Sequence, residues 1–184
     1  MLHRSLGFHC VLLSALWLVA CEAEAPSASA DTQAHEKAAV QGPRARPIRP
    51  PRAATKWNGA QIDWWTYAEG SEVAKREGRP MLAVFKGDWC PHCSNYSRLF
   101  ARPDIVALSQ RFVMVLVDDK EDPAVSTQWA PDGKYVPRTL FFSPDGEHDA
   151  TLQGRNSRFR YFLDEHGADE LKALMQRAAG LYGS

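Results

Sequence analysis

The chain has no net charge, few cysteines and no apolar stretch long enough to cross a membrane. Its 22 basic and 22 acidic residues give a formal net charge of zero, so the composition indicates no nucleic-acid or other strongly charged partner. The main apolar run, residues 10–20, is too short to span a bilayer as a helix. Only four cysteines occur, and no second Cys/His pair has the spacing of a zinc site, so we expect no metal. A chain of 184 residues is enough for one domain with short appendages.

The apolar run near the N-terminus has the form of a targeting segment. It follows a short stretch that contains Arg4, and it ends at residues 18–21 in Leu-Val-Ala-Cys. An apolar core of this length is typical of a signal peptide, and its ending resembles the bacterial lipobox, in which small residues precede a lipidated cysteine. We therefore expect residues 1–20 to be removed and Cys21 to become the lipidated N-terminus. An ordinary signal peptide that is cut elsewhere is the alternative.

These expectations place the mature protein at a membrane surface. Because Cys10 would leave with the signal peptide and Cys21 would carry lipid, only Cys90 and Cys93 would remain as thiols. An exported chain with a single Cys-x-x-Cys indicates an oxidising compartment, which we expect to be the bacterial periplasm. The residue after Cys21 is Glu22 and not an aspartate. By analogy with bacterial lipoproteins, this predicts sorting to the outer membrane.

Residues 21–56 are predicted to be a disordered tether. They are rich in Ala, Pro and Arg and include no aromatic residue, so they cannot bury enough apolar surface to offset the chain entropy. The basic residues between positions 44 and 56 could touch anionic lipid head groups, but a solvated linker is the simpler interpretation. The folded domain is expected over residues 57–184.

The chemistry of the chain is expected in residues 89–93, Trp-Cys-Pro-His-Cys. An apolar strand is predicted before them, over residues 81–85, and a helix after them, over residues 94–101. The free N–H groups and the partial positive charge of a helix N-terminus favour a thiolate over a thiol, so we expect Cys90 to be the nucleophile. Cys93, one turn later, can attack a mixed disulfide at Cys90 and release the client.

Pro91 and His92 lie between the two cysteines. Pro91 suits the first turn of a helix. His92 can donate a hydrogen bond or, when protonated, offer a positive charge to the Cys90 thiolate. A more stable thiolate stabilises the reduced form, which makes the disulfide a stronger oxidant. The alternative is that His92 is an exposed helix residue without a role.

Periodicity and turn residues predict the other elements of the domain. Thr66 and Glu69 have the spacing of a capping box at a helix start. The acidic cluster at residues 118–122 is expected to be a solvated loop, because its spacing is not that of a calcium loop. A Pro-Asp-Gly turn at residues 144–146 predicts a hairpin. We expect helices over 66–77, 104–110 and 168–179, and strands over 111–117, 138–143 and 147–152.

These motifs together resemble the thioredoxin superfamily. They are the Trp-Cys-x-x-Cys between a strand and a helix, the second strand over 111–117, and residues 135–139, Tyr-Val-Pro-Arg-Thr. Their order over residues 64–180 is similar to that of the anterior-gradient family of small thioredoxin-like proteins of the endoplasmic reticulum and of its bacterial relatives. The resemblance implies an α/β thioredoxin fold, with a central mixed sheet flanked by helices on both faces.

The resemblance also implies a client-binding groove beside the cysteines. It predicts that Pro137 follows a cis peptide bond and lies close to the Cys-x-x-Cys, where a client peptide could pair with Val136 as an added strand. Trp89, Val136, Pro137 and Arg138 are the residues expected to contact the client, with Arg138 as a charged rim. A trans turn proline at position 137 is the alternative.

One position departs from the thioredoxin pattern. Thioredoxins have a buried aspartate six residues before the first cysteine, where it takes a proton from the second cysteine, and Val84 occupies that position here. Lys86 and Asp88 are the nearby candidates to assist Cys93, and the sequence does not choose between them.

Three classes of function are consistent with these features. The first is a thiol–disulfide oxidoreductase, as an oxidase or isomerase, acting on cysteine-containing exported proteins. The second is a membrane-anchored reductase of the same fold, fed with electrons by a membrane partner. The third is a thioredoxin-fold binding or chaperone module. The Pro-His dipeptide favours the first class, and no cofactor is expected beyond the redox-active Cys90–Cys93 disulfide.

Overall fold

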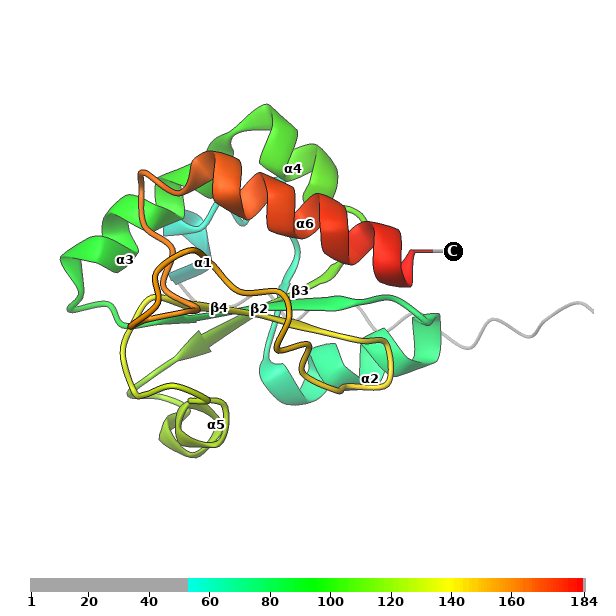
Figure 1. Ribbon diagram of the computed structural model, residues 1–184, viewed down its shortest axis with the longest axis horizontal. Coiled ribbons are helices and arrows are strands. Elements are labelled where there is room, and N and C mark those ends of the chain that lie inside the picture. Colours follow the sequence, from blue (N-terminus) through cyan, green and yellow to red (C-terminus); the bar gives the residue numbers. More distant parts are fainter. Residues whose placement is uncertain (1–52, 184) are drawn as a thin grey trace, which may run out of the picture. The chain divides into compact units, whose positions relative to one another are not determined.

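The computed structural model describes residues 53–183, and these form a four-stranded sheet with helices on both faces (Figure 1). The predicted signal peptide, the predicted lipidation site Cys21 and nearly all of the predicted tether lie outside the described residues. The strands run in the order β1-β3-β2-β4. Strands β1 and β2 are parallel to β3, and β4 is antiparallel to β2, so the predicted mixed sheet is confirmed. The strands are β1 (Trp64–Trp65), β2 (Met81–Lys86), β3 (Val113–Asp118) and β4 (Arg138–Phe142).

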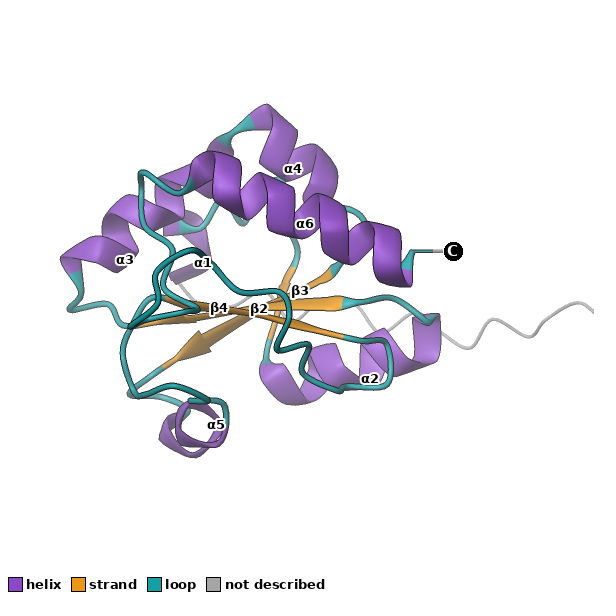
Figure 2. Ribbon diagram, viewed as in Figure 1, coloured by secondary structure: helices purple, strands orange, loops and turns teal. Residues whose placement is uncertain are grey.

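The helices divide between the two faces of the sheet. Figure 2 shows α3, α4 and α6 above the strands and α2 and α5 below them. This is the layered α/β arrangement that the resemblance to thioredoxins implies. The helices are α1 (Ala53–Lys56), α2 (Tyr67–Glu77), α3 (Pro91–Tyr96), the 3-10 helix η1 (Ser97–Ala101), α4 (Pro103–Ser109), α5 (Pro123–Gln128) and α6 (Ala168–Tyr182).

Alternation along the strands separates two hydrophobic cores. Leu82 and Val84 of β2 pack in the core that contains both cysteines. Met81, Ala83 and Phe85 pack in the opposite core, against α2. Every residue of β2 and β3 is buried, because successive side chains point to opposite faces and helices cover both.

The predicted ends of α2 are confirmed. Thr66 is the N-cap, and its Oγ1 accepts a hydrogen bond from the backbone N–H of Glu69 at 3.4 Å. The Glu69 carboxylate accepts in return from the Thr66 hydroxyl at 2.8 Å. Gly78 ends the helix in the left-handed region, with φ of 62°, where a residue without a Cβ is favoured.

The helix that follows the cysteines is shorter than predicted. It is α-helical only to Tyr96 and continues as η1 from Ser97. The Ser97 hydroxyl donates to the carbonyl of Ser94 at 2.8 Å. Such a side-chain bond competes with the α-helical pattern and suits a tighter 3-10 turn.

The second strand of the predicted hairpin, over 147–152, does not form. A single bridge joins Phe142 and His148, after which the chain turns. The Asp149 carboxylate accepts from the backbone N–H of Thr151 at 2.9 Å, which gives the backbone a local partner in place of the strand ladder. Leu152 then points into the core that holds the cysteines.

The acidic cluster at 118–122 is only in part the solvated loop that we predicted. Asp118 is the last residue of β3 and is buried. Its carboxylate forms an ion pair with Lys86, which explains how a charge is tolerated there. Helix α5, which we did not predict, follows the cluster directly.

None of the helices between residues 53 and 183 combines the length and the apolar composition that crossing a membrane requires.

Candidate active site

Cys90 is the N-cap of α3, at the turn that leads out of β2. Its Sγ accepts a hydrogen bond from the backbone N–H of Cys93 at 3.4 Å. Pro91 takes the first helical position, where its missing N–H leaves no bond unmade. The sulfur therefore accepts one of the free N–H groups of a helix start, which is an environment that stabilises negative charge.

Cys93 is the more deeply placed of the two cysteines. It is 2% exposed, against 6% for Cys90, and both are free thiols in the structure. Burial raises the pKa of the Cys93 thiol to about 12, although a backbone hydrogen bond from Gly87 and the charge of Lys86 act in the opposite direction. The pair is therefore asymmetric, with Cys90 nearer the surface and Cys93 a protonated thiol behind it.

Val136 and Pro137 lie beside Cys90, as the resemblance implied. The Cys90 Sγ is 3.5 Å from the carbonyl oxygen of Val136. The peptide bond between Val136 and Pro137 is cis. The fold thus brings together two segments that are 46 residues apart.

Trp89 and His92 are on the exposed rim of the site. The Trp89 side chain is 58% exposed, and its indole lies over Gly87, where a Cβ would approach its Nε1 to 2.7 Å. A larger residue at position 87 would therefore displace the exposed indole from this position. His92 is exposed, with its ring edge-on to Phe162 at 5.8 Å between centroids. Phe162 comes from a loop that the sequence analysis did not connect to the site.

Arg138 does not form the charged rim that we predicted. Its side chain is 0% exposed. It alternates with Thr139 along β4, and Thr139 bonds Tyr96 of α3, so Arg138 points to the opposite face of the sheet. There its guanidinium donates to the carbonyl of Ser126 in α5 and stacks over the ring of Phe85. Burial lowers the pKa of Arg138.

Lys86 and Asp118 form a buried ion pair at the ends of two parallel strands. The Lys86 Nζ is 2.5 Å from the Asp118 carboxylate and 2.8 Å from that of Asp88. Lys86 and Asp88 were predicted to lie near Cys93, whereas Asp118 was not. One feature of the sequence could have revealed this ion pair. Of two apolar strands, the first ends in a lysine and the second in an aspartate.

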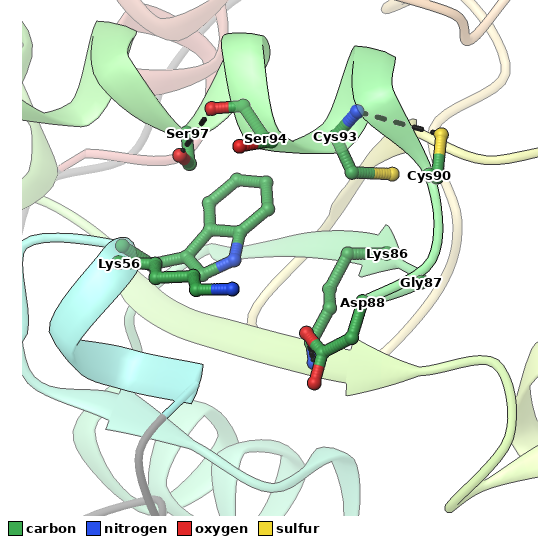
Figure 3. Close-up of a pocket in the computed structure, with 9 residues that line it drawn as sticks. Lys56, Lys86, Gly87, Asp88, Cys90, Cys93, Ser94 and Ser97 are labelled. Carbon is green, nitrogen blue, oxygen red and sulfur yellow. Dashed lines mark hydrogen bonds and ion pairs between the residues drawn. The ribbon is translucent and has the colours of Figure 1, made fainter.

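A small pocket joins these charges to the cysteines. Figure 3 shows Cys90 and Cys93 at the start of α3, with Lys86, Gly87 and Asp88 below them and Lys56 on the far side. The pocket has a volume of about 10 Å³, which is about what one water molecule needs. Its lining is Lys56, Trp57, Lys86, Gly87, Asp88, Cys90, Cys93, Ser94 and Ser97.

Comparison with known proteins gives matches to thioredoxin-like proteins. A family model described as thioredoxin-like matches residues 63–144. Anterior gradient protein 3 of Xenopus tropicalis is 30% identical over 138 residues, which cover 73% of this chain and 82% of that protein. The anterior gradient protein 2 homolog of Mus musculus is 32% identical over 139 residues, covering 74% and 77%. Among solved structures, a thioredoxin from Thermus thermophilus matches with a TM-score of 0.48 and 24% identity, over 64% of this chain and 87% of that chain.

Proposed function

This chain belongs to the anterior gradient family of thioredoxin-like proteins, and on that premise we propose that it is a thiol–disulfide oxidoreductase for exported proteins. The thioredoxin-like domain supports a function of this kind. The observation that carries the proposal is the position of Cys90. Its sulfur caps α3, accepts the N–H of Cys93 and lies 3.5 Å from the Val136 carbonyl. Both thiols are buried, and Cys90 is the less buried of the two, 6% exposed against 2% for Cys93.

The reaction follows from this asymmetry. A client thiolate attacks the Cys90 sulfur of the Cys90–Cys93 disulfide, which forms a client–Cys90 bond and breaks the Cys90–Cys93 bond. Cys93 leaves as a thiolate and takes up a proton. A second client thiolate then attacks the client sulfur, so the client gains a disulfide and Cys90 leaves as a thiolate. Two electrons pass from client to protein, and the reverse sequence reduces a client disulfide.

The surface around Cys90 and Val136 is proposed to hold the client backbone. Val136 offers backbone groups to an extended peptide in the manner of strand addition, and Pro137 shapes the same wall. The exposed indole of Trp89 gives apolar contact area next to the reacting sulfur. We assign no client contact to Arg138, because its side chain lies on the other face of the sheet.

The cellular setting belongs to the same proposal. The chain would act in the bacterial periplasm, held by lipid on Cys21, on exported proteins that contain cysteines. A membrane redox partner would return the pair to its working oxidation state. The pair would need no cofactor or metal, because the Cys90–Cys93 disulfide carries the electrons.

Trapping of clients tests the proposal. Cys93→Ser should accumulate mixed disulfides between Cys90 and client proteins, because the serine cannot displace the bound client. Cys90→Ser and the double variant should accumulate none. The measurement is a non-reducing gel of cells that express each full-length variant, with a reduced sample beside each lane. Trapping by Cys90→Ser in place of Cys93→Ser would reverse the roles, and no trapping by either variant would favour a non-catalytic binding module.

A further inference from the structure

Lys86 is a buried cation on the same face of the sheet as the two cysteines. It is the last residue of β2 and follows Leu82 and Val84 in the alternation that places those side chains in the core of Cys90 and Cys93. The Lys86 side chain is 3% exposed. It lies one alternation beyond Val84, the position where the thioredoxin pattern has a buried acid. In this chain the buried charged residue of β2 is therefore two positions closer to the active-site turn than the acid of the thioredoxin pattern, and it is a base.

Two carboxylates hold this ammonium in place. Asp118 is the residue of β3 in register with Lys86, and it also accepts the backbone N–H groups of Lys120 and Glu121 at 2.8 and 3.2 Å. Asp88 is the second partner, and its side chain is 63% exposed. Burial alone would lower the pKa of Lys86, but the hydrogen bonds and charges of Asp118 and Asp88 outweigh it and raise that pKa. Lys86 therefore stays positively charged at neutral pH.

One pocket is lined both by this cation and by the thiol that must be deprotonated. Lys86, Asp88 and Cys93 all line it, together with Lys56 at its far side (Figure 3). Cys93 is buried away from bulk water, and its ordinary solvation is lost. A fixed cation in the same pocket adds to the backbone hydrogen bond from Gly87 in favouring a thiolate there.

We propose that Lys86, held by Asp118 and Asp88, is a positioning residue whose charge stabilises the Cys93 thiolate during disulfide exchange. The inference rests on the proposed function and adds to it the group that replaces the missing acid at Val84. Because Lys86 acts through its charge on Cys93 and touches no client, it is not itself a catalytic residue. Its effect applies when Cys93 attacks and, in the reverse direction, when Cys93 leaves.

The step that Lys86 assists is the resolution of a mixed disulfide. The Cys93 thiol loses its proton to solvent through the pocket. The resulting thiolate attacks the Cys90 sulfur, the Cys90–Cys93 bond forms, and the bond between Cys90 and the client breaks. The client sulfur leaves as a thiolate with the electron pair of that bond, and a proton from solvent restores its thiol. The protein is oxidised by two electrons and the client disulfide is reduced.

A chromogenic aromatic disulfide separates the two chemical steps. The reduced full-length chain, with Cys10→Ser and Cys21→Ser in every version, is mixed with a small excess of the reagent. Cys90 releases the first coloured thiolate and Cys93 releases the second. In Lys86→Met/Asp118→Asn, which removes the pair without leaving a buried charge, the pH profile of the second release should move to higher pH. The expected slowing is about threefold for each unit by which the Cys93 pKa rises, because the thiolate becomes scarcer but more nucleophilic.

Two further variants keep the assignment to Lys86 falsifiable. Asp118→Asn alone leaves Lys86 paired with Asp88. The pH profile of the second thiolate release should therefore stay close to that of the parent chain. Lys172→Met/Asp104→Asn removes another Lys–Asp pair, at 3.3 Å between α6 and α4, and should change neither release.

The outcomes separate this inference from the proposed function. A profile of the Lys86→Met/Asp118→Asn variant that coincides with the parent profile would overturn the role of Lys86 while leaving the oxidoreductase intact. A full shift in Asp118→Asn alone would assign the effect to the carboxylate and would also overturn it. A parent chain whose Cys90 releases no coloured thiolate would overturn the proposed function, and this inference with it.

Discussion

At the scale of single residues, the two cysteines differ in surroundings although they are one helical turn apart. Cys90 caps α3 and lies against the Val136 carbonyl, whereas Cys93 is buried over a pocket that contains Lys86. Burial raises the pKa of Cys93, so this thiol is protonated at neutral pH. The order of attack that we propose, Cys90 first and Cys93 second, rests on this difference in position.

His92 is predicted to set the direction of the chemistry. The imidazole is exposed at the first turn of α3, where a partial positive charge would favour the thiolate of Cys90. His92→Leu removes that contribution, so the disulfide should become a weaker oxidant by tens of millivolts, about 30 mV for each tenfold loss of thiolate preference. The measurement is a glutathione redox titration of the parent chain and the variant.

A second histidine supplies the control for this prediction. His166 is also exposed but lies outside the turn between the cysteines, so His166→Leu should leave the potential unchanged. An unchanged potential in His92→Leu would remove the role that we give to His92. A parent potential as low as that of thioredoxin would favour the reductase over the oxidase.

At the scale of elements, local signals in the sequence were sufficient where one segment decides the outcome. The capping box at Thr66 predicted the start of α2 correctly, because its partner, the backbone N–H of Glu69, is within the same helical turn. The helix start at Cys90 and Pro91 was also predicted from neighbouring residues alone. The predicted strand over 147–152 failed because the side chain of Asp149 offers the backbone a competing partner, which strand propensity does not register.

Contacts between distant segments could not be predicted in the same way. Lys86 and Asp118 are 32 residues apart, and only the register of β2 against β3 makes them neighbours. Arg138 was assigned to the client groove because it follows Pro137, but the face of the sheet that it occupies depends on the pleat of β4. Its true partners in α5 are 12 residues away in a helix that the sequence did not signal.

Arg138 is therefore predicted to stabilise the fold. Arg138→Met would leave the carbonyl oxygens of Tyr135 and Ser126 without their donor. Each unsatisfied buried acceptor costs about 1–3 kcal/mol, and relief from burying a charge offsets part of this loss. We expect a net decrease of about 1–3 kcal/mol in the free energy of unfolding, measured by denaturant titration, with unchanged client trapping in the Cys93→Ser background.

An exposed arginine provides the comparison. Arg158 lies over the Phe159 ring at the surface, and Arg158→Met should change stability by less than about 0.5 kcal/mol. Loss of client trapping in Arg138→Met, with stability retained, would instead restore the groove assignment.

At the scale of the whole molecule, the residues of the candidate active site and the buried Arg138 network lie on opposite faces of the sheet. The face covered by α3 and α6 holds the cysteines, the pocket and Lys86, and the face covered by α2 and α5 holds Arg138. β2 contributes to both faces, since Lys86 and Phe85 are adjacent residues with opposite orientations. Substitutions at neighbouring positions of one strand should therefore affect either exchange chemistry or stability.

The last prediction concerns how the chain is held in the cell. The ending Leu-Val-Ala-Cys at residues 18–21 predicts that Cys21 is lipidated. One acyl chain binds a membrane only reversibly, whereas a second acyl chain makes the anchoring stable. Cells fed a fatty-acid analogue should label the parent chain, and Cys21→Ser should lose both the label and membrane flotation. Cys10→Ser is the matched control, because Cys10 lies in the predicted signal peptide and its loss should leave the label in place. Label retained by Cys21→Ser, together with flotation, would show that the anchor lies elsewhere and that residues 1–20 are not a lipoprotein signal.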